Sequence, residues 1–395
     1  MTTFHGAACN GLTTLRGLLK DAAPFRDQNT KKPCKGGCFW MAGNAFQTAI
    51  ECMVNIGQKD TFGLGQDAVA YFNNAITDPN NPTQWAARPT GEKGEFVYWV
   101  DDYGWWGDLF IYSYNNADAL GYSSEFKDAL LLNAEHCWEA LNACWDPSEI
   151  SWTDIVGPLH VAVQHTITGG IPNISDDTQK NSELAGRNCV TNEVFWRLST
   201  NLYNAAGPHS HYLNADANVN KLFGQAKNQN ILFDDNGLVF ERFYGLPKSS
   251  QPTWTWLGDQ GLFLSCCYFN KFGDGPTIPW NDPTVLFNAV KAAKTTAHQK
   301  VLHEDPAPWP DFRLDYACGK GTFMRNLMYL NNRLHTVDDG KSYYDDFIQT
   351  NAIAVWKNKK MSSFPSIGIT RLTNRLTKFG GTAGKWLMLY CMPLV

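Results

Sequence analysis

The sequence predicts an all-α protein, an (α/α)6 barrel in which six helical hairpins form a toroid. Three observations lead to this prediction. Helical periodicity dominates the 395 residues, the expected helices number close to a dozen, and polar or Gly/Pro-rich loops separate them. No long run of alternating strands is expected, which argues against a βαβ architecture. Because no interdomain linker or low-complexity tract interrupts the chain, we expect residues 1–395 to form a single domain.

The expected helices are about 14–22 residues long and are joined in pairs, as hairpins require. They cover residues 40–57, 65–77, 102–116, 123–145, 184–206, 214–228, 257–271, 282–303, 319–334, 341–358 and 376–391. Loops at 78–95, 168–183, 245–254, 272–280 and 305–313 separate several of them. A short alternating segment at 237–244 predicts a strand or a β-turn excursion. Such a barrel keeps its sites at one end, on the loops between inner and outer helices.

Composition excludes several classes of partner. The net charge is −5 and the basic residues are scattered, so neither a nucleic acid nor an anionic membrane is expected to bind. No stretch of about 18 apolar residues predicts a membrane span. The first residues lack the features of a leader, so we expect a cytoplasmic protein, or an exported one whose leader has been removed. We expect a monomer that needs no metal and no cofactor, since no phosphate-binding loop or metal-ligand set is found.

The most informative feature is the pair of neighbouring aspartates Asp101 and Asp102, flanked by Trp99, Trp105 and Trp106. Like charge and nearby indoles both raise a carboxyl pKa, and two carboxyls in different protonation states are what a glycoside hydrolase needs. Cβ atoms of neighbouring residues lie roughly 5–6 Å apart, close to the carboxyl separation of about 5–5.5 Å in retaining enzymes. The pair therefore predicts a retaining glycosidase. The alternative is that both aspartates serve a helix N-terminus, where Asp is common.

Five segments in order are similar to motifs of glycoside hydrolase family 76, the α-1,6-mannanases with an (α/α)6 barrel. They are residues 99–106, 187–195, 254–264, 319–327 and 347–352, followed by Trp356. The resemblance implies endo-type hydrolysis of α-1,6-linked mannosides or a related α-glycan, with an oligosaccharide or polysaccharide as partner. It also implies that Asp101 is the nucleophile and Asp102 the acid/base, an order that the spacing does not decide.

The chain departs from the family pattern at three places. The Gly-Gly-x-Trp-Trp loop of the family becomes 169–173, which has no aromatic residue. Its Tyr-Asn-Gln-Gly becomes Leu257-Gly258-Asp259-Gln260-Gly261. The acidic stretch before Phe-Lys-Gly becomes 314–318. These segments lie where substrate would be held, so they bear on the identity and linkage of the sugar.

Further side chains are expected to contact substrate. Indoles and phenols offer flat apolar faces to a pyranose ring, while amide, carboxyl and amino groups bind its hydroxyls. The predicted substrate-binding residues are Trp105, Trp106, Tyr103, Asn44, Asn192, Glu193, Gln260 and Lys320.

Two other functions remain open. One is a sugar isomerase or epimerase on the same barrel, which would use histidine as acid/base. Its candidates are His160, His165, His209 and His211. The other is a non-catalytic glycan-binding protein. Conversion of free monosaccharides would identify the isomerase, and binding without turnover would identify the binding protein.

Overall fold

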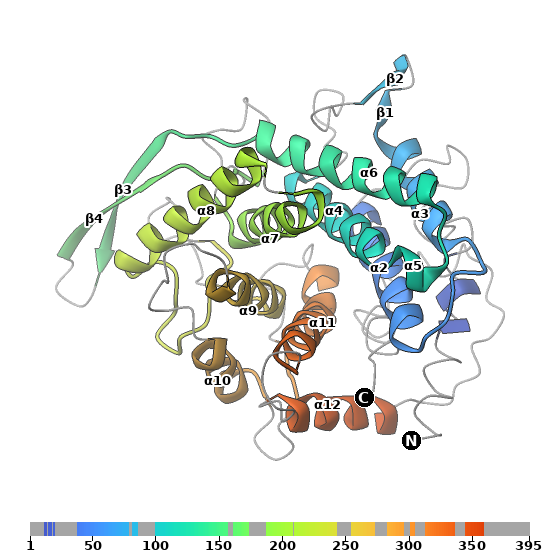
Figure 1. The fold of residues 1–395 in the computed structure, drawn as a ribbon. Coiled ribbons are helices and arrows are strands. Elements are labelled where there is room, and N and C mark those ends of the chain that lie inside the picture. Colours follow the sequence, from blue (N-terminus) through green and yellow to red (C-terminus); the bar gives the residue numbers. More distant parts are fainter. Residues whose placement is uncertain are drawn as a thin grey trace.

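The described part of the chain forms most of an (α/α)6 barrel, as the sequence predicted (Figure 1). The computed structural model describes residues 12–13, 15–17, 19, 38–78, 81–85, 99–156, 161–173, 187–207, 209–242, 254–272, 283–295, 301–304, 313–335 and 344–358. The inner helices are α2 (Cys38–Asn55), α4 (Val100–Asn115), α7 (Cys189–Ala206), α9 (Leu257–Phe272) and α11 (Arg313–His335). The outer helices are α3 (Leu64–Ile76), α6 (Ser124–Ala143), α8 (Ser210–Asn228), α10 (Pro283–Ala293) and α12 (Asp345–Asn358).

Inner and outer helices alternate along the chain, with the short α5 (Ala117–Leu120) between α4 and α6. Each outer helix returns the chain antiparallel to its inner partner, as in an αα-hairpin. The inner helices therefore run in the same direction, and their N-terminal ends lie at one end of the barrel. We call this end the mouth. The helix expected at 376–391 lies outside the described residues.

Local sequence explains where several helices start and stop. The hydroxyl of Ser123 accepts a hydrogen bond from the backbone N–H of Phe126, which caps α6. The side-chain oxygen of Asn188 caps α7 in the same way, accepting from the N–H of Thr191. Gly121 ends α5 with φ of 75°, a left-handed conformation that glycine adopts without strain. The predicted helices at 123–145 and 257–271 match α6 and α9 within two residues.

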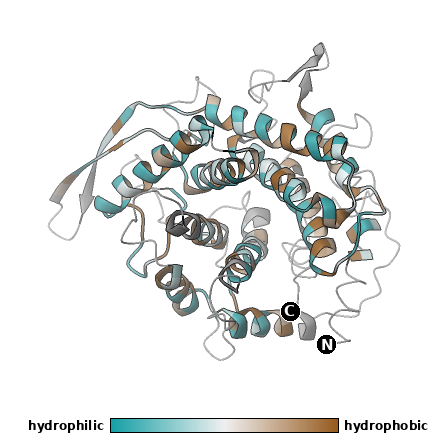
Figure 2. Ribbon diagram, in the orientation of Figure 1, coloured by the Kyte–Doolittle hydropathy of each residue, from teal (hydrophilic) through white to brown (hydrophobic). Residues whose placement is uncertain are grey.

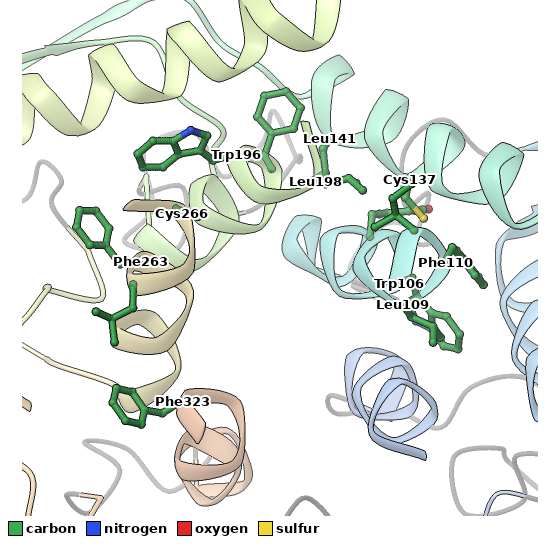
Figure 3. Close-up of a cluster of buried hydrophobic side chains, with 14 of the residues drawn as sticks. Trp106, Leu109, Phe110, Cys137, Leu141, Trp196, Leu198, Phe263, Cys266 and Phe323 are labelled. Atoms are coloured by element: carbon green, nitrogen blue, oxygen red, sulfur yellow. The ribbon is translucent and has the colours of Figure 1, made fainter. Parts of the chain in front are cut away.

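The amphipathic pattern of the outer helices places the core between the two layers. Along α6 the buried residues recur at helical spacing, from Leu130 through Ala134, Cys137 and Trp138 to Leu141. Figure 2 shows these hydrophobic positions alternating with hydrophilic ones along α6 and α8. Buried side chains from α4, α6, α7, α9 and α11 continue around the ring (Figure 3). Those labelled are Trp106, Leu109, Phe110, Cys137, Leu141, Trp196, Leu198, Phe263, Cys266 and Phe323.

Glycines allow the inner helices to approach closely. A Cβ on Gly104 would overlap the side chain of Val194, so α4 and α7 touch at this point. A Cβ on Gly261 would lie 2.6 Å from the Cα of Phe323, so the backbones of α9 and α11 are in contact. The glycines of the motifs at 99–106 and 254–264 therefore have a packing role. They bring the polar residues beside them together at the mouth.

Some predicted elements were wrong in extent or were missed. The helix predicted at 282–303 ends at Ala293, and Thr295 then forms an isolated bridge with Leu302. The predicted start of α11 was six residues late. The sequence did not predict the hairpin in which β3 (Glu149–Val156) pairs antiparallel with β4 (Val161–Thr168). A second small hairpin joins β1 (Thr77–Asp78) to β2 (Asn81–Trp85).

The β3–β4 hairpin extends beside α8 (Figure 1). Two glutamines of α8 hold it there: Gln225 accepts a hydrogen bond from the N–H of Thr168 at 2.9 Å, and Gln229 accepts one from the N–H of Thr166 at 2.6 Å. The segment at 237–244 was predicted as a strand or β-turn excursion. In its described part, Val239 forms an isolated bridge with Phe233 around a turn that contains Gly237.

Candidate active site

The two neighbouring aspartates lie in the first turn of α4, but they have different partners. Asp102 is only 2% exposed, and its Oδ2 accepts a hydrogen bond from the backbone N–H of Trp99 at 3.1 Å. Asp101 is partly exposed, and its Oδ2 accepts a hydrogen bond from Trp105 Nε1 at 3.3 Å. The helix-capping alternative thus describes one contact of Asp102, whereas Asp101 is held by an indole one turn further along the helix.

Electrostatics set Asp101 apart from an ordinary surface aspartate. Burial raises its pKa from 3.8 to about 6, although the hydrogen bond from Trp105 opposes the shift. The negative charge of Glu241 raises it further. Asp101 therefore changes its protonation state at about pH 6, within the range where a carboxyl group can exchange a proton or act as an ionised nucleophile.

Three more carboxyl groups from other elements of the barrel belong to the same cluster, since the charges of Asp101, Glu193 and Glu241 all act on Asp259. Glu193 is on α7, Asp259 is on α9, and Glu241 lies in the segment between α8 and α9. Burial raises the pKa of all three, and the pKa of Asp259 is raised further by the charges of Glu193 and Glu241. The hydroxyl of Tyr316, on α11, donates a hydrogen bond to Glu241 at 3.0 Å. Four elements thus contribute to one acidic site.

Sequence reasoning selected Glu193 but missed Glu241 and did not select Asp259. The signal for Asp259 was its place in the motif at 254–264, within a segment where the chain departs from the family pattern. No sequence signal identified Glu241, because its place depends on backbone pairing. Its carbonyl accepts from the N–H of Cys189 and its N–H donates to the carbonyl of Trp254, which ties the segment to the starts of α7 and α9.

Indoles lie beside the acidic site, but the two members of the predicted tryptophan pair lie in different clusters. Trp105 packs with Trp40, with ring centroids 5.8 Å apart, and Trp40 meets Trp256 edge to face at 6.5 Å. Trp106 instead lies in the hydrophobic core, where it stacks on Tyr71 at 5.6 Å. Neighbouring helix positions face about 100° apart, so the two tryptophans of the pair point in different directions.

Tyr103 and Lys320 complete the set of predicted substrate contacts. Tyr103 is buried in the core and packs edge to face on Phe39 and Phe72, so the prediction that it contacts substrate is not supported by its position. Lys320 is partly exposed on α11. It follows Tyr316 by four residues and so lies on the same helix face.

The three predicted amides bind protein backbone instead of pointing freely into the site. Asn192 exchanges two hydrogen bonds with the backbone of Ile171, at 2.9 and 3.0 Å. Gln260 does the same with Val239, at 2.8 Å for both bonds. Asn44 donates to the carbonyl of Trp40 at 3.1 Å and accepts from Arg325. The expectation that these amides contact substrate is therefore replaced by a positioning role.

Two of these amides, Asn192 and Gln260, clamp backbone that lies next to an acidic residue of the site. Asn192 fixes the loop 169–173, and the carbonyl of Asn173 accepts from the N–H of Val100, next to Asp101. Gln260 fixes Val239, two residues before Glu241. The clamps thus connect α7 and α9 to the backbone that carries the carboxyl groups.

A second charged layer lies further along the inner helices, away from the mouth. Arg197 Nε lies 3.1 Å from Asp108 Oδ2, and Arg197 also donates to Asn326. Glu51 faces both Arg197 and Arg325, whose positive charges lower its pKa against the larger opposite effect of burial. Here each buried carboxyl has an arginine nearby. At the acidic site, Arg242 likewise lowers the pKa of Glu241 against the larger effect of burial.

Three of the four candidate histidines are described, and they lie on β4 or at the start of α8. His165 is on β4 and packs on Trp152, while His209 and His211 stack on one another at the start of α8. His160 lies outside the described residues. None of the described ones is near Asp101, so their positions do not favour a histidine-based isomerase.

Within the described residues, no group of three or more His, Cys, Asp or Glu side chains has a metal-binding arrangement. In the same part of the chain, no helix is both long and apolar enough to cross a bilayer.

The whole-chain comparison with solved structures gives the fold. The α-1,6-mannanase GH76A of Salegentibacter sp. HEL1_6 matches with a TM-score of 0.64 and 15% identity, over 99% of this chain and 98% of that chain. That structure is an inactive variant, changed at two consecutive aspartates, in complex with α-1,6-mannotetrose. The chain has the fold of family 76 α-1,6-mannanases. Neither a family model nor a curated protein matches its sequence. The low sequence identity to the solved mannanases fits a divergent member.

Other neighbours extend the range of the fold. The Lin0763 protein of Listeria innocua matches with a TM-score of 0.61 and 14% identity, over 98% of this chain and 96% of that chain. Dfg5 from Chaetomium thermophilum, in complex with glucosamine, matches with a TM-score of 0.62 and 13% identity, over 98% of this chain and 88% of that chain. The likeness to a family 76 barrel that the five motifs predicted is thus confirmed for the fold.

Proposed function

We propose that this chain is a retaining glycoside hydrolase that acts on α-1,6-linked mannosides or a related α-glycan, with Asp101 as nucleophile and Asp102 as acid/base. The observation that carries the proposal is the position of Asp101. It is partly exposed at the mouth and bound by Trp105, and burial, with a smaller contribution from the charge of Glu241, raises its pKa to about 6. The inactive variant of the Salegentibacter mannanase supports the proposal, because the two aspartates changed in it are consecutive, as Asp101 and Asp102 are here.

The reaction proceeds in two balanced halves. Ionised Asp101 attacks the anomeric carbon, the glycosidic C–O bond breaks, and Asp102 gives its proton to the leaving oxygen. A water then attacks the glycosyl–Asp101 ester and gives a proton to Asp102, which releases the sugar and restores both carboxyls. Two inversions at one carbon give net retention.

The surrounding residues bind and orient the sugar in this proposal. The indoles of Trp40, Trp105 and Trp256 form a buried cluster beside Asp101, and the hydrogen bond from Trp105 holds Asp101 in place. Glu241, held by Tyr316, accepts hydrogen bonds from sugar hydroxyls, and Lys320 donates to them. Residues 1–395 act as one catalytic domain, and the protein functions as a monomer.

Substitution of each aspartate tests the proposal. The Asp101→Asn and Asp102→Asn variants should each lose nearly all hydrolysis of α-1,6-mannan and of aryl α-mannosides while keeping a cooperative thermal transition. Azide added to the Asp101→Asn variant should restore turnover by forming a glycosyl azide. Azide added to the Asp102→Asn variant should restore turnover only on substrates with good leaving groups. Wild-type rates in both variants would refute the assignment. Conversion of free mannose without water addition would instead identify an isomerase.

A further inference from the structure

Side chains of α2 and α11 join the second charged layer to the acidic site. Arg325, on α11, donates a hydrogen bond from Nη2 to the side-chain oxygen of Asn44 on α2, a residue 281 positions away in the chain. The amide nitrogen of Asn44 donates in turn to the backbone carbonyl of Trp40, one helical turn earlier, at 3.1 Å. Arg325 thus reaches the first turn of α2, which carries Trp40.

The first turn of α2 packs against the two neighbouring tryptophans of α4. Trp106 Nε1 donates a hydrogen bond to the backbone carbonyl of Phe39 at 3.0 Å. The ring of Trp105 packs on the ring of Trp40, with centroids 5.8 Å apart. Trp105 Nε1 then donates to Asp101 Oδ2 at 3.3 Å. A continuous series of contacts therefore runs from the second charged layer to the proposed nucleophile.

The side chains that transmit this series are held inside the protein. Asn44 is 0% exposed, Trp105 is 1% exposed and Trp40 is 6% exposed. A buried polar group keeps its hydrogen bonds because water cannot replace them. Packed side chains also move together, since the interior has few voids. A change at one contact should therefore shift the next side chain in the series.

The charges of the second layer fix the guanidinium group of Arg325. Burial lowers the pKa of Arg325, and the negative charges of Glu51 and Asp108 oppose this effect. Glu51 follows Asn44 by seven residues, or two turns of α2, so both lie on one face of that helix. This face gives Arg325 one hydrogen-bond acceptor and one opposite charge.

The hydrogen bond from Trp105 makes Asp101 easier to ionise, because it opposes the effect of burial on the pKa of this carboxyl. Among the described residues, the titratable groups that act on Asp101 or respond to its charge are Glu241 and Asp259, both acidic. If the indole moves away, burial is opposed less, and Asp101 takes up its proton at a higher pH. The position of the indole therefore affects how readily the nucleophile ionises.

We propose that Arg325 and Asn44 are positioning residues of the hydrolysis, which hold the first turn of α2 so that Trp40 keeps the indole of Trp105 against Asp101. The inference rests on the proposed function, because both residues act through the proposed nucleophile. Neither side chain needs to touch the sugar for this role.

The pH dependence of kcat/KM tests the inference. Asn44→Leu removes both hydrogen bonds of the amide without a change of charge. The acid limb of kcat/KM should move to higher pH by about half a unit to one unit, as the loss of one hydrogen bond gives. At pH values below the limb, such a move lowers kcat/KM about three- to tenfold. At pH 8 the change should be smaller, because Asp101 is ionised there in both proteins.

A conservative variant separates positioning from a general loss of packing. Asn44→Ser should keep the acid limb of the wild type, because a helical hydroxyl can donate to the carbonyl four residues earlier. Thr48 already does so on the same helix, donating to the carbonyl of Asn44 at 2.8 Å.

The matched control is Asn326→Leu, in the same charged layer. Asn326 is also 0% exposed, accepts a hydrogen bond from Arg197 and donates to the carbonyl of Thr322 at 2.9 Å. The control thus removes the same two kinds of hydrogen bond. Within the described residues neither of these bonds leads to Trp105, so the acid limb should stay in place.

Two further variants follow the effect along the series. Trp105→Phe keeps an aromatic ring but removes the N–H that reaches Asp101, so it should move the limb to higher pH. Asn44→Leu added to Trp105→Phe should then bring no further move, since both changes act through one contact. Arg325→Lys keeps the positive charge but lacks the planar guanidinium, so it should move the limb in the same direction by a smaller amount.

The outcomes that overturn the inference are distinct from those that overturn the proposed function. An acid limb that stays in place in Asn44→Leu or in Arg325→Lys overturns the inference, and so does an equal move in Asn44→Ser or Asn326→Leu. A further move in the double variant with Trp105→Phe shows that Asn44 does not act through the indole. Arg325→Lys keeps the test decisive even if Asn44→Leu does not fold.

The wild type and Asp101→Asn tell the two failures apart. Hydrolysis that depends on Asp101, with an acid limb that these changes do not move, would leave the proposed function standing while this inference fails. Hydrolysis that Asp101→Asn does not affect would overturn the proposed function itself.

Discussion

Replacement of Asp101 by asparagine should stabilise the protein at neutral pH while removing its activity. Burial disfavours the charged carboxyl, and the pKa of Asp101 is about 6 in the folded chain against an ordinary value of 3.8. At 1.36 kcal/mol for each pH unit, this difference corresponds to about 3 kcal/mol of lost stability once the group is ionised. Because Asp101 is partly exposed, solvent screening reduces the expected gain to about 1–3 kcal/mol.

The sign of the pH dependence follows from the raised pKa. Below about pH 4 the carboxyl is protonated in both folded and unfolded chains, so asparagine brings no gain. Between about pH 4 and pH 6 the wild type loses stability as Asp101 ionises in the unfolded chain first. Above about pH 6 the gain of the variant is complete.

Thermal melts at several pH values measure the effect. An unfolding entropy of about 2.1 cal/mol/K per residue gives roughly 0.8 kcal/mol/K for 395 residues, so the Tm of Asp101→Asn should rise by about 1–4 °C at pH 7.5. The control Asp128→Asn, at an exposed position of α6, should change Tm by less than about 1 °C. No gain at pH 7.5, or an equal gain at pH 4, would refute the reasoning.

Three further predictions concern the chemistry and packing of the site. The kcat/KM of the wild type should fall as pH drops through about 6, since the nucleophile Asp101 must be ionised; a fall on raising pH through the same value would assign Asp101 as the acid instead. Gly104→Ala should lower the free energy of unfolding by about 1–3 kcal/mol, because the new Cβ clashes with Val194. In denaturant titrations, the double variant with Val194→Ala should recover part of this loss. If the losses of stability in the two single variants simply add in the double variant, the contact is contradicted. Gln260→Leu should lower kcat more than it raises KM, because it removes the two hydrogen bonds that hold Val239 and the segment that carries Glu241. An unchanged kcat would show that these hydrogen bonds do not position the site.

The fold could be predicted from sequence because its elements are long and periodic. Helices such as α6 and α9 combine buried residues at helical spacing with clear ends, and the order of inner and outer helices follows from their connection in pairs. The β3–β4 hairpin was missed because its alternation is weak. Ile150 and Ile167 face the core side, but polar residues such as Thr166 and Gln164 make the pattern resemble a loop.

A residue of the site could be predicted only where one motif contains both the reactive side chain and the side chain that holds it. Asp101 and Trp105 are one helical turn apart, so their contact could be read from the spacing. Trp106 could not be placed in this way, since the choice between site and core depends on the packing of α2 and α3. The amides were assigned to substrate because sequence does not show which loop backbone lies within reach. Glu241 was missed for the same reason.

The product anomer tests the central claim most directly. Proton NMR during the first turnovers on α-1,6-mannan should show the α-anomer forming before mutarotation, as a double displacement through Asp101 requires. Initial appearance of the β-anomer would contradict the account, since it would mean that water, and not a carboxylate of this chain, attacks the anomeric carbon.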